Sequence, residues 1–207
     1  MLRLYVCLYS DKELSYSDKL FSDYRKKKLS RQMNPHIRKQ SVVSELLLGY
    51  ALRESGHFIG SPLSIVTGQY GKPALEGKDC HFSLSHSDHA AVCALSDGEV
   101  GADIQKLTPI KKELVKRYFA AEEQSYVQCA AETDRAFTMV WTMKESFCKY
   151  TGEGLHLPLA SFNVFDPALY PRFQVFDLED YQMSVFSQKK RDHPAELILV
   201  DENALCR

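Results

Sequence analysis

The stretch HFSLSHSDHAAVCALSDGEVGADIQKL, residues 81–107, divides this sequence into two halves. Within it, HFSLS and AAVCALS have the pattern of a strand pair. Asp97 and Gly98 then give a turn signal, and EVGADIQKL has the pattern of a further strand. We therefore expect the first half of the chain to end near residue 100.

The residues before this stretch predict a strand, a polar helical stretch and an amphipathic helix. LRLYVCLYS, residues 2–10, has the apolar, aromatic and β-branched residues typical of an opening strand. From Pro35 to Arg53 the apolar residues recur at helical spacing, and Gly56 follows the last of them. SPLSIVTGQYGKPAL, residues 61–75, predicts a strand that runs into a Gly-Lys-Pro turn.

The second half begins with helices and ends with strands. Two helices are predicted by PIKKELVKRYF and AAEEQSYVQCAAE, and a longer one with an apolar stripe extends from about Asp134 to Tyr150. SFNVF, RFQVFDL, YQMSVFS and AELILV are strand-like. We therefore predict an α/β (α+β) fold of two similar lobes, residues 1–100 and 101–207, each with an antiparallel-type sheet packed with helices.

The composition is that of a globular protein with balanced charge. Of its 207 residues, 44% are hydrophobic, which is enough for a buried core. Lys and Arg number 26 against 27 Asp and Glu, so no global field indicates nucleic acid or a membrane as a partner. Residues 16–40 carry eight basic side chains against two acidic ones, and they either attract a polyanion or form a solvated helix face.

The cysteines and the chain's apolar segments indicate a cytoplasmic protein. The six cysteines are scattered, with no C-x-x-C pair, which is typical of reduced thiols in a cytosolic protein. No segment approaches 18 consecutive apolar residues, and the first residues contain no small-residue cleavage site. We expect a chain that is neither exported nor inserted in a membrane.

Two pairs of polar side chains are candidates for a metal site. In a strand over VGADIQ, Asp103 and Gln105 share one face while Ala102 points to the other. On the long helix, Glu145 and Lys149 are four residues apart and also share a face. One or two carboxylates suffice for Mg²⁺ when phosphates and water complete its shell, whereas an exposed salt bridge is the plainer interpretation of the helical pair.

The three histidines of the opening stretch invite two other interpretations. His81, His86 and His89 lack the usual spacing of zinc ligands, and no cysteine accompanies them. A Ser-His-Asp hydrolase is weaker still, because no G-x-S-x-G elbow precedes the serines. The residues alone leave these alternatives open.

Five motifs, in this order and spacing, resemble the 4'-phosphopantetheinyl transferases of the long, surfactin-synthetase-activating type. They are YGKPAL, FSLSHSDHAAVCAL, VGADIQK, KRYFAAEE and WTMKESFCKYTGEGL, and the resemblance covers about residues 2–165. It implies two pseudo-symmetric α/β lobes in one functional monomer, with coenzyme A in the cleft between them. It also implies Mg²⁺-dependent transfer of phosphopantetheine from coenzyme A to a serine of an apo acyl or peptidyl carrier protein, with release of adenosine 3',5'-bisphosphate.

The resemblance implies a role for each matched residue. Asp103 and Glu145 match the metal carboxylates, and Glu145 is also the candidate general base, acting directly or through a water. Lys149 matches a lysine that meets the pyrophosphate. The other matched residues bind phosphates of the nucleotide, with the Ser-His pair on the 3'-phosphate: Arg25, Lys28, Lys72, Ser85 and His86.

The sequence departs from the family pattern at two positions. Gln105 stands where these enzymes usually carry a third acidic residue, so we expect an amide oxygen in place of one metal carboxylate. Gln40 aligns best with a phosphate-binding arginine, and Lys39 or Arg38 is expected to substitute for it. His81 and His89 lie outside the matched pair and are expected to be structural.

Two other functions remain compatible with these residues. A Mg²⁺-dependent nucleotide pyrophosphohydrolase would use the same carboxylates with water as nucleophile, and it would break down coenzyme A without a carrier protein. A non-catalytic coenzyme A-binding module would bind its ligand regardless of Mg²⁺ and of Glu145. The intact WTMKESFCK motif disfavours the second alternative.

Overall fold

The computed structural model describes residues 1–207 except 13, 58–59, 61, 78, 191–192 and 207. The first sheet has the strand order β4 (His81–Ser87), β5 (Ala90–Ser96), β1 (Leu2–Leu8), β9 (Glu196–Leu199). The second sheet has the order β6 (Val100–Lys106), β8 (Tyr181–Ser187), β7 (Phe173–Leu178), with both pairs antiparallel. A short hairpin contains β2 (Ile65–Thr67) and β3 (Pro73–Leu75).

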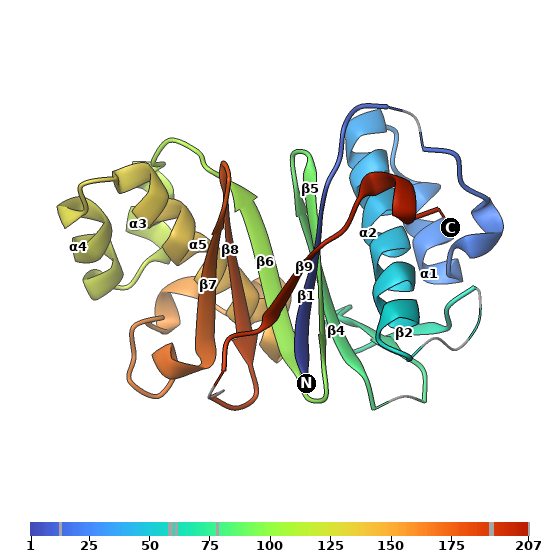
Figure 1. The fold of residues 1–207 in the computed structure, drawn as a ribbon. Coiled ribbons are helices and arrows are strands. Elements are labelled where there is room, and N and C mark those ends of the chain that lie inside the picture. Colours follow the sequence, from blue (N-terminus) through green and yellow to red (C-terminus); the bar gives the residue numbers. More distant parts are fainter. Residues whose placement is uncertain (13, 58–59, 61, 78, 191–192, 207) are drawn as a thin grey trace.

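The helices cover the outer flanks of the two sheets, as Figure 1 shows. On the flank of the first sheet lie α1 (Asp23–Leu29) and α2 (Pro35–Glu54). On the flank of the second sheet lie α3 (Lys112–Tyr118), α4 (Ala121–Cys129) and α5 (Thr133–Thr151). The predicted mixed α/β (α+β) fold, with helices packed on small sheets, is therefore confirmed.

The central strands are buried on both faces, which explains their continuous apolar sequences. In β5 the odd-numbered residues pack in the core beneath α2, and the even-numbered ones meet the second sheet: Ala91, Cys93 and Leu95 against Ala90, Val92 and Ala94. The core between the sheets also receives Val100, Ala102 and Ile104 of β6. The face of β6 that carries Asp103 is thus turned toward α5.

The predicted helix ends agree with their capping residues. The Asn34 side chain accepts hydrogen bonds from the backbone of His36 (2.9 Å) and Ile37 (3.3 Å) and so begins α2, whose Pro35 occupies the first turn. Gly152, with φ of 78°, ends α5 in the left-handed conformation that glycine adopts readily. No helix in the described parts of the chain has the length and apolar character needed to cross a bilayer.

The last strand does not follow the predicted division into residues 1–100 and 101–207. β9 lies parallel to β1, with Leu197 opposite Leu4, and so extends the first sheet. Val200 and Leu205 then enter the core beneath α2. The pattern of AELILV predicts a strand. Its neighbouring strand, β1, lies at the other end of the sequence, so the pattern alone cannot indicate this pairing.

The segment SFNVF, residues 161–165, was predicted as a strand and is not one. Its backbone groups bind side chains instead: Lys144 Nζ donates to the Phe162 carbonyl (2.9 Å), and Val164 N donates to Glu123 Oε1 (2.7 Å). The Asn163 side chain accepts from Phe165 N (2.9 Å), which forms a local turn. The buried apolar residues of this segment therefore pack without a neighbouring strand.

Candidate functional site

A glycine sets the distance between α5 and β6. A Cβ built on Gly101 would lie 2.0 Å from the Ser146 carbonyl oxygen and 2.3 Å from Tyr150 N, so only glycine allows the helix to approach this closely. Asp103, two residues farther along β6, projects from the same face. The close approach brings this aspartate to the polar side of α5.

The Asp103 carboxylate is the centre of the polar cluster at this contact. It is only 6% exposed, and its Oδ1 atom accepts hydrogen bonds from Ser85 Oγ (2.7 Å) and from Lys149 Nζ (2.6 Å). Glu145 lies one helical turn before Lys149 and is half-buried. The predicted shared face of Glu145 and Lys149 is therefore turned toward Asp103, which excludes the exposed salt bridge as the explanation of this pair.

The Glu145 carboxyl lies in an environment that disfavours its charge. Burial raises its pKa, the nearby charge of Asp103 raises it further, and the Lys149 ammonium opposes both effects. Two carboxylates in a partly desolvated site are a donor set that fits a hard divalent cation. Asp103 and Glu145 therefore fit Mg²⁺ on the chemistry of this chain's own residues.

A cavity of about 280 Å³ opens beside this polar cluster. Its walls come from both halves of the chain, since α1, the β2–β3 hairpin and β4 face the end of α5 across it. The cavity brings together five of the predicted ligand-binding residues: Arg25, Lys28, Lys72, His86 and Lys149. Four cations around one cavity indicate a ligand with several negative charges.

His86 is neutral in this environment. Burial lowers its pKa to about 4, and the positive charges of Lys149, Arg25 and Lys28 act in the same direction. The neutral His86 ring can donate one hydrogen bond to a ligand. An anion bound among these cations would offset their charges and raise the pKa of His86. The site is therefore arranged for an anionic group near His86.

Besides Lys149, two more of the cations already have acidic partners. Arg25 Nε donates to Glu45 Oε2 (3.1 Å), and both side chains are buried, so the guanidinium is fixed in the cavity wall. Lys72 Nζ donates to Glu99 Oε2 (2.6 Å) and to the Tyr150 carbonyl (2.9 Å). Arg25 is preorganised, whereas Lys72 must exchange the partly exposed Glu99 for a ligand.

Ser85 makes a contact that the resemblance did not predict. The serines of β4 join the two sheets through side chains: Ser83 Oγ accepts from Ala102 N (2.9 Å), and Ser87 Oγ accepts from Lys106 N (3.1 Å). Ser85 stands between them, is only 7% exposed and donates to Asp103. Its hydroxyl therefore orients the central carboxylate, and a contact of Ser85 with a phosphate stays a prediction.

Lys39 lies outside the cavity, contrary to the prediction that it substitutes for a phosphate-binding arginine. Its ammonium binds the carbonyl oxygens of Ser10 and Lys12 and lies 3.4 Å from Glu202 Oε1. Arg38 also turns away from the cavity, because its guanidinium donates to the Leu29 carbonyl (2.8 Å). Both side chains point away from the cavity because the start of α2, where they stand, faces other segments: Lys39 contacts the segment after β1, and Arg38 contacts the end of α1.

Gln40 and Gln105 are the two departures from the family pattern. Gln40 Nε2 donates to the Asp88 carbonyl (3.2 Å), so this residue connects α2 to the β4–β5 turn. Gln105 Nε2 donates weakly to the neighbouring Lys106 carbonyl (3.4 Å), and its side chain is half-buried on the strand face that carries Asp103. A metal contact from Gln105 stays a prediction.

The other two histidines of β4 and its turn do not line the cavity. His81 Nδ1 lies 3.1 Å from Glu99 Oε1, beside the carboxylate that also holds Lys72. His89 packs against Tyr9 with ring centroids 5.8 Å apart. Their separation from His86 agrees with the prediction that they have other roles.

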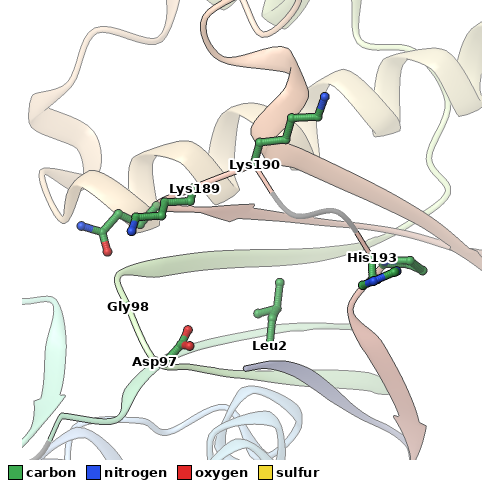
Figure 2. A pocket seen from close by; sticks show the side chains of 8 residues that line it. Leu2, Asp97, Gly98, Lys189, Lys190 and His193 are labelled. Atoms are coloured by element: carbon green, nitrogen blue, oxygen red, sulfur yellow. The ribbon is translucent and has the colours of Figure 1, made fainter.

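A second cavity, of about 520 Å³, lies near the start of the chain and lacks the site residues. Figure 2 shows Leu2 and Asp97 on one side of it and Lys190 and His193 on the other. None of the residues matched to the family motifs lines this cavity. Its greater volume therefore does not make it the candidate site.

Sequence reasoning missed several residues of the site. Tyr24 and Tyr70 line the cavity with aromatic rings, and Ser44 of α2 adds a hydroxyl. Tyr70 is 47% exposed and packs on His156 with centroids 4.9 Å apart. Tyr70 directly precedes the Gly-Lys-Pro turn in the motif YGKPAL, and this position next to Lys72 could have indicated that it lines the cavity.

Comparison with known proteins finds one family. Residues 99–198 match the family model described as the 4'-phosphopantetheinyl transferase superfamily. The chain is 31% identical over 165 residues to "4'-phosphopantetheinyl transferase Sfp" of Bacillus subtilis, covering 76% of this chain and 74% of that protein. It is 31% identical over 185 residues to "4'-phosphopantetheinyl transferase psf-1" of Bacillus pumilus, covering 82% of this chain and 79% of that protein.

Proposed function

The chain belongs to the 4'-phosphopantetheinyl transferase family, of the Sfp type, and is therefore an enzyme; from this premise we propose that it transfers phosphopantetheine from coenzyme A to an apo carrier protein. The acceptor is a serine hydroxyl of an acyl or peptidyl carrier protein. Its oxygen attacks the phosphorus next to the pantetheine, and the bond from that phosphorus to the bridging oxygen breaks. The serine proton is released, and adenosine 3',5'-bisphosphate leaves with the bridging oxygen.

The observation that carries this proposal is the cavity that joins both halves of the chain. Arg25, Lys28 and Lys72 reach it from the first half, and Lys149 reaches it from α5. Coenzyme A carries three phosphates, which the four cations complement in charge, and His86 adds a hydrogen-bond donor. The exposed ring of Tyr70 offers a face on which a nucleobase can stack.

Lys149 connects the cavity to the carboxylates. Its ammonium lies 2.6 Å from Asp103 Oδ1 and also lines the cavity, so a small movement takes it from the carboxylate to a pyrophosphate oxygen. Its side chain is 30% exposed, which leaves room for this movement. The lysine then stabilises the charge that develops on the leaving bisphosphate.

Glu145 is the proposed general base, because its raised pKa makes it a better proton acceptor than an exposed glutamate. It takes the serine proton directly or through one water. Asp103 and Glu145, with Gln105 on the same strand face as Asp103, would hold Mg²⁺. When bound, Mg²⁺ neutralises charge on the pyrophosphate.

We further propose that one chain is the functional unit. The cavity and the carboxylates are both complete within a single chain, since β4, β6 and α5 supply them. Sedimentation of the active enzyme is expected to give a monomer. An obligate oligomer with residues of two chains in each cavity would contradict this part of the proposal.

The function is tested by incubation of the protein with coenzyme A, Mg²⁺ and a panel of apo carrier proteins. We expect at least one carrier to gain the mass of one phosphopantetheine, with stoichiometric release of adenosine 3',5'-bisphosphate. A control reaction without carrier separates this function from that of a pyrophosphohydrolase. Breakdown of coenzyme A in that control, with no carrier modified, would contradict the proposed transfer.

Glu145→Gln tests the mechanism at the proposed base. We expect transfer to be abolished while the affinity for coenzyme A stays within a few-fold, because the phosphate contacts come from other residues. Glu113→Gln, a change of an exposed glutamate of α3 that does not line the cavity, is the matched control. Near-normal turnover by Glu145→Gln would remove this residue from the mechanism.

A further inference from the structure

A second group of potential metal ligands lies at the rim of the first sheet. One ligand atom from each of Asp11, His36 and His89 lies within 4.8 Å of the other two. The three residues come from three elements: the segment after β1, the first turn of α2 and the β4–β5 turn just before β5 begins. None of them lines the cavity with Lys149, so the group is separate from the catalytic site.

The two ring nitrogens of His89 face carboxylates on opposite sides. Nδ1 lies 3.9 Å from Asp11 Oδ1, and Nε2 lies 3.8 Å from Asp88 Oδ1. The Nδ1 atom is buried and has no hydrogen-bond partner among the described residues. An imidazole that offers one nitrogen to a metal while the other faces a carboxylate is the usual arrangement of a metal-bound histidine.

The surrounding contacts hold the group together. Gln40 Nε2 lies 3.2 Å from His36 Nε2 and 3.2 Å from the Asp88 carbonyl oxygen, so it links the helix to the turn. Asp88 has φ of 49°, and its Oδ2 atom accepts from Lys106 Nζ (2.6 Å), which leaves Oδ1 beside both histidines. The ammonium of Lys39 anchors the segment that carries Asp11.

We propose that Asp11, His36 and His89 form a zinc site, with Asp88 as the carboxylate that faces His89 on its far side. Two imidazoles and one carboxylate suit Zn²⁺, whereas Mg²⁺ prefers oxygen ligands alone. Ligand atoms of a tetrahedral zinc ion lie about 3.3 Å apart at normal bond lengths. Asp11 is 84% exposed, so its side chain can close the remaining distance.

The bound metal would add a further link among three segments that hydrogen bonds already join. It would fix the β4–β5 turn, three residues beyond His86, to the start of α2 and to the segment after β1. The site thus stabilises the first sheet and takes no part in the transfer reaction. A fourth position remains open to water.

The test is a titration of the untagged protein with Co²⁺, read by its absorption spectrum, followed by displacement with Zn²⁺. The parent is expected to bind one equivalent with a tetrahedral cobalt spectrum and to gain thermal stability with Zn²⁺. Asp11→Asn and His89→Gln are each expected to weaken Zn²⁺ binding at least about tenfold. His57→Gln, a change of an exposed histidine elsewhere, should bind as the parent does.

Two outcomes would overturn the proposal. One is the absence of a saturable complex of one equivalent in the parent. The other is equal Zn²⁺ affinity of the parent and Asp11→Asn, a substitution of a highly exposed side chain that leaves the fold intact. Excess Mg²⁺ is expected not to displace the cobalt, because Mg²⁺ prefers oxygen ligands alone.

Discussion

Two lysines of α5, five residues apart in one motif, have opposite environments. Lys144 is fully buried, and its ammonium is saturated by Glu123 (2.8 Å) and by the carbonyl oxygens of Leu159 (2.8 Å) and Phe162 (2.9 Å). Lys149 is 30% exposed, and its only acidic partner within salt-bridge distance among the described residues is Asp103.

The difference separates structural charge from functional charge. A buried ammonium with every proton bonded has no freedom to bind a ligand, and its loss leaves an unpaired carboxylate in the core. A partly exposed ammonium beside a cavity can exchange its partner at low cost. The four predictions below test this contrast and are ranked by their effect on the free energy of unfolding.

The largest effect is expected from Lys144→Met. Glu123 would keep its charge in a fully buried site without its ammonium partner, so the free energy of unfolding should fall by about 3–5 kcal/mol. Urea unfolding followed by circular dichroism measures this. Lys26→Met, which removes an exposed ion pair with Asp23, is the control and should change stability by less than about 1 kcal/mol. An equal response of the two variants would refute the contrast.

The next effect is expected from Gly101→Ala. The added methyl group would overlap the backbone of Ser146 and Tyr150, so α5 must move away from β6. We expect a loss of about 3 kcal/mol in stability, the upper end of the usual cost of overpacking. Turnover should fall as well, because Lys149 and Asp103 lose their alignment. Gly98→Ala, which meets only the flexible end of the Gln188 side chain, is the matched control.

The third effect concerns the pH dependence of stability. The pKa of His86 is about 4 in the folded protein against an ordinary value of 6.5, so the unfolded chain binds the proton more strongly. The contribution of the neutral His86 ring to the free energy of unfolding is therefore present above pH 6.5 and is lost as the pH falls toward 4. It amounts to about 2 kcal/mol between pH 7 and pH 5.

His86→Asn isolates this contribution from that of other titrating groups. Glu145 acts in the opposite direction, because its raised pKa favours the folded state as the pH falls. The free energy of unfolding of the parent and of His86→Asn is measured by urea unfolding at each pH. The difference between the two values should therefore change with pH only through the protonation of His86. Parallel stability curves for the two proteins would contradict the lowered pKa of His86.

The smallest effect on stability is expected from Lys149→Met. Only the lysine of this ion pair is partly exposed, and the buried Asp103 carboxylate keeps its hydrogen bond from Ser85, so the loss of stability should be about 1 kcal/mol, while transfer should fall strongly. The pKa of His86 should rise, because the charge of Lys149 lowers it more than any other nearby charge, after the larger effect of burial. Titration of the His86 ring by NMR checks this, with Lys26→Met as a control that leaves the ring unaffected.

The sequence predicted most elements of the fold, because their patterns are local. The apolar stripe of α5 and the caps at Asn34 and Gly152 specify helices through contacts within a few residues. The alternation along β6 is enough to place Asp103 on the face opposite Ala102. The resemblance to a family then named five residues that line the cavity.

Prediction from the sequence was wrong where a segment or side chain could form hydrogen bonds with more than one group in the folded protein. SFNVF has the composition of a strand, but Lys144 and Glu123 bind its backbone groups first. Lys39 is basic and adjacent to the matched position, yet the carbonyl oxygens of the segment after β1 bind it. Both errors come from contacts between residues at least 18 positions apart.

By itself, the sequence determined most of the residues that form helices and strands, with SFNVF as an exception, and which family the chain resembles. Only the tertiary structure decided that β9 joins β1, that Ser85 orients Asp103 and that His36 and His89 meet. The physical reason is that periodicity specifies the buried face of an element but not the surface that covers it. That choice depends on the packing of distant segments, as the approach of α5 to Gly101 illustrates.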